Sequence, residues 1–156
     1  MSDPRESPHL DAPVEHWEAV VEDMAATAEE YEAEGWRTLQ LHPGDVRVRE
    51  AEPPGFEVLA PDSEYDRLAA FLNEGVAFDD YRVFAATDGG LAFLVVAAED
   101  GAADTAVLFP LYYDPDGPAA AMFEAANERG ALVSRVRRLS GEYVDLEHTD
   151  PGLFRA

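Results

Sequence analysis

The sequence predicts an α+β fold, a mostly antiparallel sheet of about six to eight strands with about three helices packed on it, in a single domain. Three observations support this prediction. Apolar residues recur at helical spacing in three segments, and elsewhere they alternate with polar residues or form short runs. The resulting order is helix, three strands, helix, three strands, helix, two strands. Short connections between successive strands favour antiparallel pairing, and 156 residues fit one domain.

The first predicted helix begins at Pro13 and ends at Gly35, after a polar segment over residues 1–12 that we expect to be a flexible tail. The predicted domain is therefore 13–156. The apolar stripe of the helix has three-and-four spacing: Trp17, Val20, Val21, Met24, Ala28 and Tyr31. Most of the carboxylates fall off that stripe: Glu15, Glu18, Glu22, Asp23, Glu29, Glu30, Glu32 and Glu34. The helix should have an apolar inner face and an acidic outer face.

After the first helix the hydrophobic period changes to two, which predicts strands over 36–41 and 46–49. The Pro43-Gly44 turn between them suits type II geometry, which is not the favoured closure of a hairpin. Direct pairing of these two strands is therefore one of two open alternatives. A further strand over 56–60 follows the break at 53–55.

The second predicted helix is capped by Asp62 or Ser63 and ends at Gly75. Strands over 81–87, 91–98 and 105–113 follow, the first two joined by an Asp-Gly-Gly turn. Residues 91–96 are apolar without alternation, which indicates a strand covered on both faces.

Pro110 lacks an N–H group, so we expect its strand to lie at an edge or to bend there. The third helix begins near Pro118 and ends at Gly130. Two last strands, over 132–139 and 142–147, flank a Ser-Gly turn and provide a second edge candidate.

The composition indicates a salt-rich cytoplasm. All eleven basic side chains are arginine, against 33 Asp and Glu, for a formal net charge of −22. Such self-repulsion is tolerated best in molar salt, where the Debye length falls to about 3 Å. Arginine forms forked ion pairs with carboxylates that lysine cannot form. An acidic surface also repels phosphates and anionic lipids, so we expect no nucleic-acid partner and no membrane.

Several chemistries have no residues to support them. The sequence contains no cysteine, which excludes disulfides and thiolate catalysis. There is no Gly-x-Ser-x-Gly elbow and no phosphate loop, and we expect no catalytic constellation, no metal site and no cofactor. No run approaches the roughly 18 apolar residues that span a bilayer.

Three groups of residues are candidates for ligand binding. His42 and Asp45 end the Pro-Gly turn and could share a ligand, although Asp at a turn more often bonds backbone amides. The other candidates are two tyrosines at a strand end and the densest cluster of positive charge: Tyr112, Tyr113, Arg135, Arg137 and Arg138. The arginines could bind a small anion, but pairing with acidic helices or with another subunit is the favoured alternative. Core packing is the favoured alternative for the tyrosines.

A likeness to a known family is carried by three stretches, 16–18 (HWE), 41–46 (LHPGDV) and 55–62 (GFEVLAPD). They resemble the small acidic proteins of unknown function found in haloarchaea. The likeness covers the chain from about residue 14 onward. It implies a haloarchaeal habitat and one domain, and it transfers no active site.

Three functions remain open. The preferred hypothesis is a cytoplasmic, non-enzymatic binding or interaction module whose sheet edge meets a protein partner or a second copy in a homo-oligomer. The second is a small-molecule enzyme or binding domain using His42, Asp45, the tyrosine pair and Arg135. The third is an acidic chaperone-like dimer, which requires an exposed apolar groove.

Overall fold

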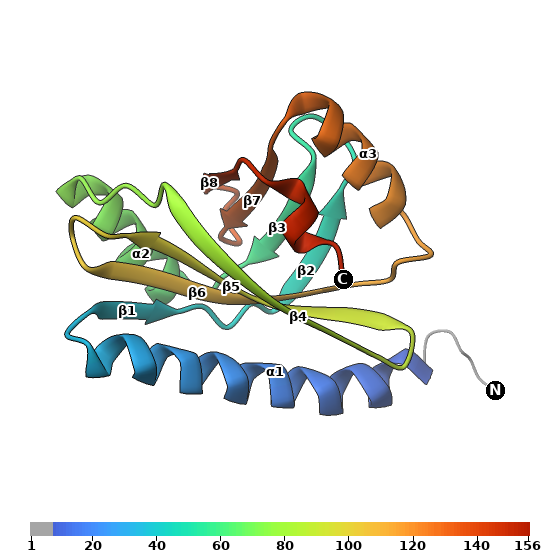
Figure 1. The fold of residues 1–156 in the computed structure, drawn as a ribbon, viewed down its shortest axis with the longest axis horizontal. Helices are drawn as coiled ribbons and strands as arrows, with labels where there is room; N and C mark the ends of the chain where they lie inside the picture. Colours follow the sequence, from blue (N-terminus) through green and yellow to red (C-terminus); the bar gives the residue numbers. More distant parts are fainter. Residues whose placement is uncertain (1–7) are drawn as a thin grey trace.

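The computed structural model describes residues 8–156, with side chains from His16 onward (Figure 1). Of the predicted tail, 1–12, residues 1–7 lie outside the described residues. The first helix begins at Pro8 and not at the predicted Pro13, so residues 8–12 are helical. The elements, in chain order, are α1 (Pro8–Ala33), β1 (Arg37–Gln40), β2 (Asp45–Arg49), β3 (Gly55–Leu59), α2 (Asp62–Glu74), β4 (Asp80–Asp88), β5 (Leu91–Asp100), β6 (Thr105–Tyr113), α3 (Ala119–Arg129), β7 (Leu132–Arg137), β8 (Tyr143–His148) and the 3-10 turn η1 (Pro151–Phe154).

The predicted α+β class is confirmed, but the strands form two mixed sheets where one was expected. The first sheet has the order β1-β6-β5-β4 and the second has the order β2-β3-β7-β8. Neighbours are antiparallel except for the pairs β1–β6 and β3–β7, which are parallel. β1 and β2 do not pair with each other. The Pro43-Gly44 turn instead carries the chain from the first sheet to the second.

The first sheet is the middle layer of the molecule. The helix α1 covers one of its faces, and the second sheet with α2 and α3 lies on the other (Figure 1). The residues between α1 and the sheet are Val20, Met24, Ala28, Tyr31, Phe93, Val95, Ala97, Ala106 and Leu108. Alternate residues of β5 and β6 enter the larger core on the opposite face of the first sheet, among them Leu94, Val96, Val107 and Phe109.

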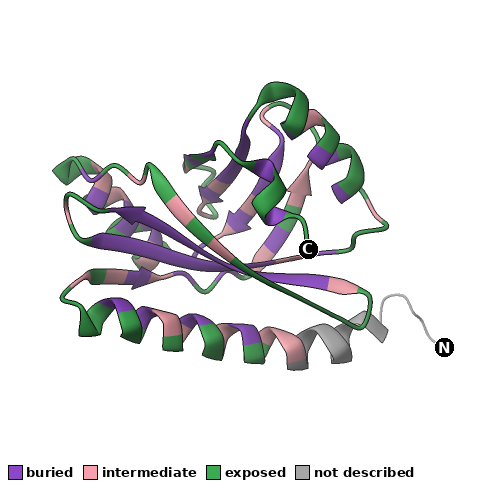
Figure 2. Ribbon diagram, in the orientation of Figure 1, coloured by how far each residue is buried: buried purple, intermediate pink, exposed green. Residues whose placement is uncertain are grey.

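The run without alternation in β5 therefore belongs to a strand buried on both faces, as predicted. Every residue from Ala92 to Asp100 is buried (Figure 2). The neighbouring β4 is largely exposed, which the figure shows in green. Burial of a large apolar side chain contributes about 1.5–3 kcal/mol, so β5 and β6 supply much of the energy that holds the three layers together.

Pro110 lies where β6 loses one neighbour. The N–H of Leu41 donates to the carbonyl of Leu108 at 2.8 Å, and β1 pairs with β6 only up to that residue. Every second residue of a strand directs its main-chain groups to the same side, so the nitrogen of Pro110 also points to the side of β1, beyond its end. The missing N–H costs no ladder bond there.

Aromatic residues close the core near η1. Phe154 is fully buried against Phe56 and Tyr81, with ring centroids 6.3 and 5.9 Å away. The hydroxyl of Tyr113 donates to the carbonyl of Phe154 at 3.0 Å and accepts from the N–H of Ala156 at 2.9 Å. These bonds favour a structural role for Tyr113 over ligand binding.

His148 lies in the same cluster, 1% exposed, with its ring 4.7 Å from that of Tyr81. Its Nε2 is 2.8 Å from the hydroxyl of Ser134, whereas Nδ1 has no partner among the described residues. Burial lowers the pKa of His148 to about 4. The imidazole is therefore neutral at pH 7.

We predict a pH-dependent contribution to stability from this histidine. The unfolded state takes up the proton near the ordinary pKa of about 6.5 and the folded state only near 4, so the free energy of unfolding falls as the pH drops through that window, by about 3 kcal/mol in total. Urea unfolding of the wild type and of a Ser134→Ala/His148→Leu variant between pH 7 and pH 4 measures it. As the pH falls from 7 to 4, the free energy of unfolding should decrease more for the wild type than for the variant.

An NMR titration of the wild type provides a check that does not depend on the variant. The ring protons of one histidine should titrate near pH 4. Titration of every histidine near pH 6.5 would contradict the prediction.

Candidate functional site

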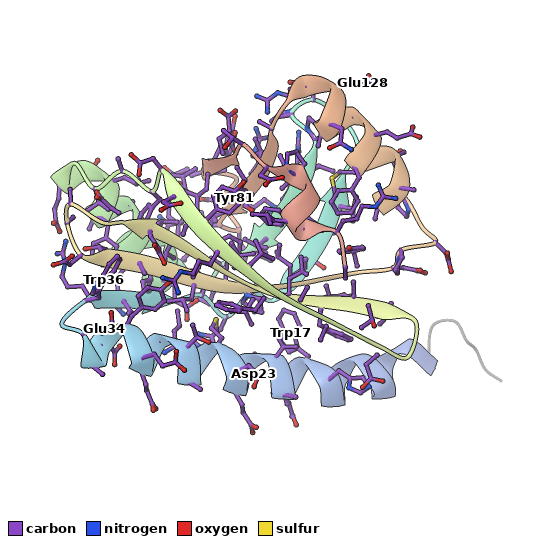
Figure 3. All side chains as sticks on the ribbon, in the orientation of Figure 1. Trp17, Asp23, Glu34, Trp36, Tyr81 and Glu128 are labelled. Carbon is purple, nitrogen blue, oxygen red and sulfur yellow. The ribbon has the colours of Figure 1, made fainter. Side chains whose placement is uncertain are left out.

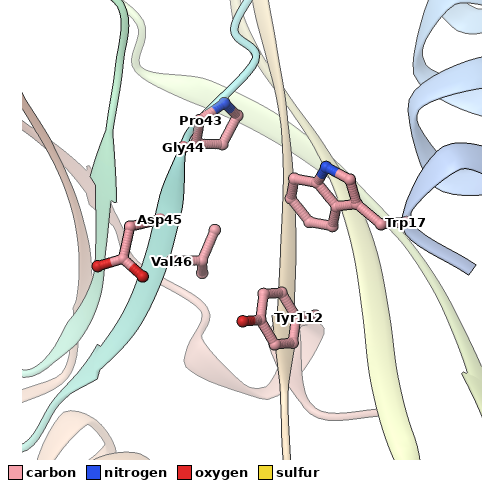
Figure 4. Close-up of a pocket in the computed structure, with 6 residues that line it drawn as sticks. All are labelled: Trp17, Pro43, Gly44, Asp45, Val46 and Tyr112. Carbon is pink, nitrogen blue, oxygen red and sulfur yellow. The ribbon is translucent and has the colours of Figure 1, made fainter. Parts of the chain in front are cut away.

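A pocket lies where the chain crosses between the two sheets. It is formed by Trp17 of α1, the turn between β1 and β2, and the part of β6 that follows Pro110. Its volume is about 180 Å³. The lining residues are Trp17, Pro43, Gly44, Asp45, Val46 and Tyr112 (Figure 4).

Two aromatic rings form adjacent walls of this pocket. Trp17 extends from α1 toward the sheet (Figure 3), and its ring centroid is 5.6 Å from that of Tyr112, with the ring planes at 76°. Phe93 lies 6.4 Å from Tyr112 in a stacked arrangement and supports it. Burial raises the pKa of Tyr112, and the nearby carboxylate of Asp45 raises it further, so the phenol is neutral at pH 7.

Asp45 is the one charged residue among those that line the pocket. Its Oδ2 atom accepts a hydrogen bond from Nε of Arg47 at 2.6 Å, and the arginine side chain is 67% exposed. Asp45 begins β2, so its position depends on the Pro43-Gly44 turn. The pocket thus combines two rings, apolar walls and a carboxylate whose arginine partner stands in solvent.

His42 has a different partner. Its Nδ1 is 2.7 Å from Oε2 of Glu64, and its backbone N–H donates to Oε1 of the same residue at 2.6 Å. Glu64 therefore attaches the turn to α2. His42 lines another hollow of about 270 Å³, with Leu59 and Leu139. Of the predicted candidates, the pocket brings together Asp45 and Tyr112 and does not include His42.

The three candidate arginines are in ion pairs. Arg135 contacts Asp145 with Nε and Nη2 at 2.8 and 3.0 Å, and its guanidinium carbon lies 3.8 Å from the centroid of the Tyr143 ring. Arg137 donates from Nε to Glu57 at 2.7 Å.

Arg138 contacts three carboxylates, at 3.0 Å for Asp66, 3.1 Å for Asp62 and 3.5 Å for Glu142. These contacts favour pairing with neighbouring acids over binding of an anion.

The sequence does not identify Trp17 and Val46 as site residues. Trp17 matches the apolar stripe of the first helix, which predicts a place on its inner face. It is only partly buried and packs on Tyr112, in the part of β6 that no longer pairs with β1. No local pattern in the sequence indicates that the turn at 42–45 and Tyr112 lie beside Trp17.

Among the side chains that the structure describes, from His16 onward, no cluster of three or more His, Asp or Glu residues could hold a metal ion. None of the described helices is long and apolar enough to cross a membrane.

The fold and the pocket define a single-domain α+β protein with an aromatic pocket at the junction of two mixed sheets. Residues 4–155 match the model of a family of unknown function (DUF7529), and the chain belongs to that family. No curated protein and no solved structure matches the chain.

Glu57 provides a test of the ion-pair assignment. It accepts from Arg137 and from Nη1 of Arg49, at 2.7 and 3.1 Å, and its side chain is 19% exposed. Glu57→Gln leaves two half-buried guanidinium groups without their shared carboxylate, so we expect a loss of about 1–2 kcal/mol in the free energy of unfolding. Urea denaturation measures this loss.

Glu142→Gln is the matched control. Its side chain is 68% exposed, and it lies 3.5 Å from Arg138. We expect it to cost less than about 0.5 kcal/mol, because exposed pairs contribute little. Equal losses for the two variants would contradict the assignment.

Proposed function

We propose that the protein is a non-enzymatic interaction module of a halophile, acting in the cytoplasm, and that two copies pair through strand β4. The observation that carries the proposal is the exposure of this edge strand. Within the described residues β4 pairs only with β5, and all residues from Phe84 to Asp88 are exposed. A sheet edge of this kind is a template for strand addition.

The exposed part of β4 is apolar on the face that it shares with α1. Phe84 is 47% exposed and lies above a groove of about 360 Å³ between the helix and the strand. Val20 and Phe93 form part of the floor, and Asp23 and Glu30 are at its rim. The groove continues the face that α1 covers elsewhere, so a neighbouring strand would extend both the sheet and its apolar surface.

The sequence of β4 is complementary to itself in an antiparallel register centred on Ala85. In that register Arg82 lies opposite Asp88 of the partner subunit, and Phe84 lies opposite Ala86 of the partner subunit. The two-fold axis repeats each contact.

Arg82 contacts Glu99 at 3.2 Å and Asp88 contacts Nδ1 of His16 at 3.0 Å within the chain. The two side chains are nevertheless 65% and 59% exposed, so each keeps an open side for the partner subunit.

The other sheet edges suit this role less well. β1 has four residues, and β2 carries Arg47 and Arg49, which would oppose like charges in a second copy. β8 carries Asp145 and Glu147, which would oppose like charges in a second copy. These features favour β4.

Charge reversal tests the register. Arg82→Asp places two carboxylates opposite each other at both ends of the pairing, and Asp88→Arg places two guanidinium groups there, so each variant alone should be monomeric. In an equimolar mixture every such pair joins a carboxylate to a guanidinium group, and heterodimers should form. Light scattering after size exclusion in molar KCl measures the mass of each sample and of the mixture.

Leu139→Glu is the control for this experiment, since Leu139 is 82% exposed and lies outside β4. It should leave the dimer intact. A monomeric wild type in molar KCl, or a mixture that stays monomeric, would refute the proposed pairing.

A halophilic habitat predicts that stability depends on salt. Between about 0.1 and 1 M KCl the Debye length falls from about 10 to 3 Å, which weakens repulsion among the carboxylates. The free energy of unfolding should rise over this range. Replacing the exposed Glu18, Glu22 and Glu29 by Gln should reduce the increase. A wild type that is equally stable at both concentrations would contradict this habitat.

A further inference from the structure

We propose that the pocket between Trp17 and Tyr112 binds a small organic cation with a methylated ammonium head. This proposal is independent of pairing through β4, because β4 is one edge strand of the first sheet and the pocket lies beside β6, on the other side of β5. It rests on the arrangement of the rings, the charge at the rim and the volume of the cavity.

The walls match the surface of such a cation. The ring planes of Trp17 and Tyr112 stand at 76° and form a corner, and Pro43 and Val46 complete the apolar lining (Figure 4). A methylated ammonium group is apolar at its surface and carries a diffuse positive charge. Aromatic faces attract such a charge through their quadrupoles, with tryptophan the strongest.

The charge of the pocket favours a cation over an anion. No arginine is among the residues that line it, and Asp45 supplies one carboxylate, of which Oδ2 accepts a hydrogen bond from the exposed Arg47 at 2.6 Å. The whole chain adds a formal net charge of −22, which concentrates cations at the surface. The phenol of Tyr112 points toward the side of β2 and offers a neutral hydroxyl group (Figure 4).

The size and the polar groups restrict the ligand further. A cavity of about 180 Å³ is smaller than the roughly 300–1,000 Å³ of sites for larger organic ligands, so it accommodates a head group of a few heavy atoms. A bare metal ion needs several oxygen ligands, and among the lining side chains only Asp45 and Tyr112 carry oxygen. A cation with an apolar surface fits this combination better.

Choline and its uncharged isostere 3,3-dimethylbutan-1-ol provide the decisive comparison. Isothermal titration calorimetry of the full chain, at constant ionic strength, should show one choline site per chain. The affinity for the isostere should be lower by about tenfold or more, because it has the same shape without the charge. Equal binding of the two probes would show a merely apolar pocket and refute the proposal, and so would the absence of saturable choline binding.

Variants assign the binding to this pocket. Trp17→Leu and Tyr112→Leu should each weaken choline about tenfold, whereas Tyr112→Phe should change it less than about twofold, since the ring face is retained. Asp45→Asn should lower the affinity for choline several-fold and leave the affinity for the isostere unchanged. Tyr112→Phe also guards against loss of folding as the explanation, because it leaves the packing against Phe93 in place.

Two further variants are controls. Trp36→Phe changes the other tryptophan, which packs on Tyr31 at the far end of α1, and it should not alter binding. Arg82→Asp tests the independence of the two proposals, because it should abolish pairing through β4 and leave choline binding intact. Choline affinity that is unchanged by both leucine substitutions would place the ligand elsewhere and overturn the inference.

Discussion

The requirement that the first sheet be covered on both faces governs the rest of this structure. β5 and β6 carry apolar side chains on successive residues, so neither face can be left to water. One helix of 26 residues covers one face, and the second sheet with two helices covers the other. Both candidate interaction sites lie where this coverage ends. The aromatic pocket begins where β1 stops, and the open groove lies where α1 no longer covers β4.

The charge of the chain is organised around these layers. Carboxylates occupy the outer face of α1, while several arginines lie on the second sheet or beside it in pairs with acids. Glu57 joins Arg49 and Arg137, and Arg138 joins the start of α2 to the last hairpin. Guanidinium groups suit this arrangement because one arginine can contact several carboxylates in fixed directions. The arginines thus connect elements that are distant in the sequence.

Local patterns in the sequence predicted most elements and the burial of β5. Periodicity identifies which residues share a face, and the absence of alternation identifies a strand that is buried on both faces of the sheet. The division into two sheets was not predicted, because it depends on parallel pairing of β1 with β6 and of β3 with β7, which no local signal records. The site was predicted in part for the same reason. Asp45 and Tyr112 were named, but the turn between the sheets directs His42 toward Glu64, a residue of another element.

The two parallel pairings also have a consequence for synthesis on the ribosome. Arg37 pairs with Thr105, 68 positions later, and Glu57 pairs with Arg135, 78 positions later (135 − 57). Neither sheet can be completed by the nascent chain until these later strands have left the exit tunnel. Until then β3 has only its hairpin partner β2, and β1 has none. Early strands with open edges are prone to associate with other chains, so the dense acidic charge of the emerging α1 would keep neighbouring nascent chains apart during that interval.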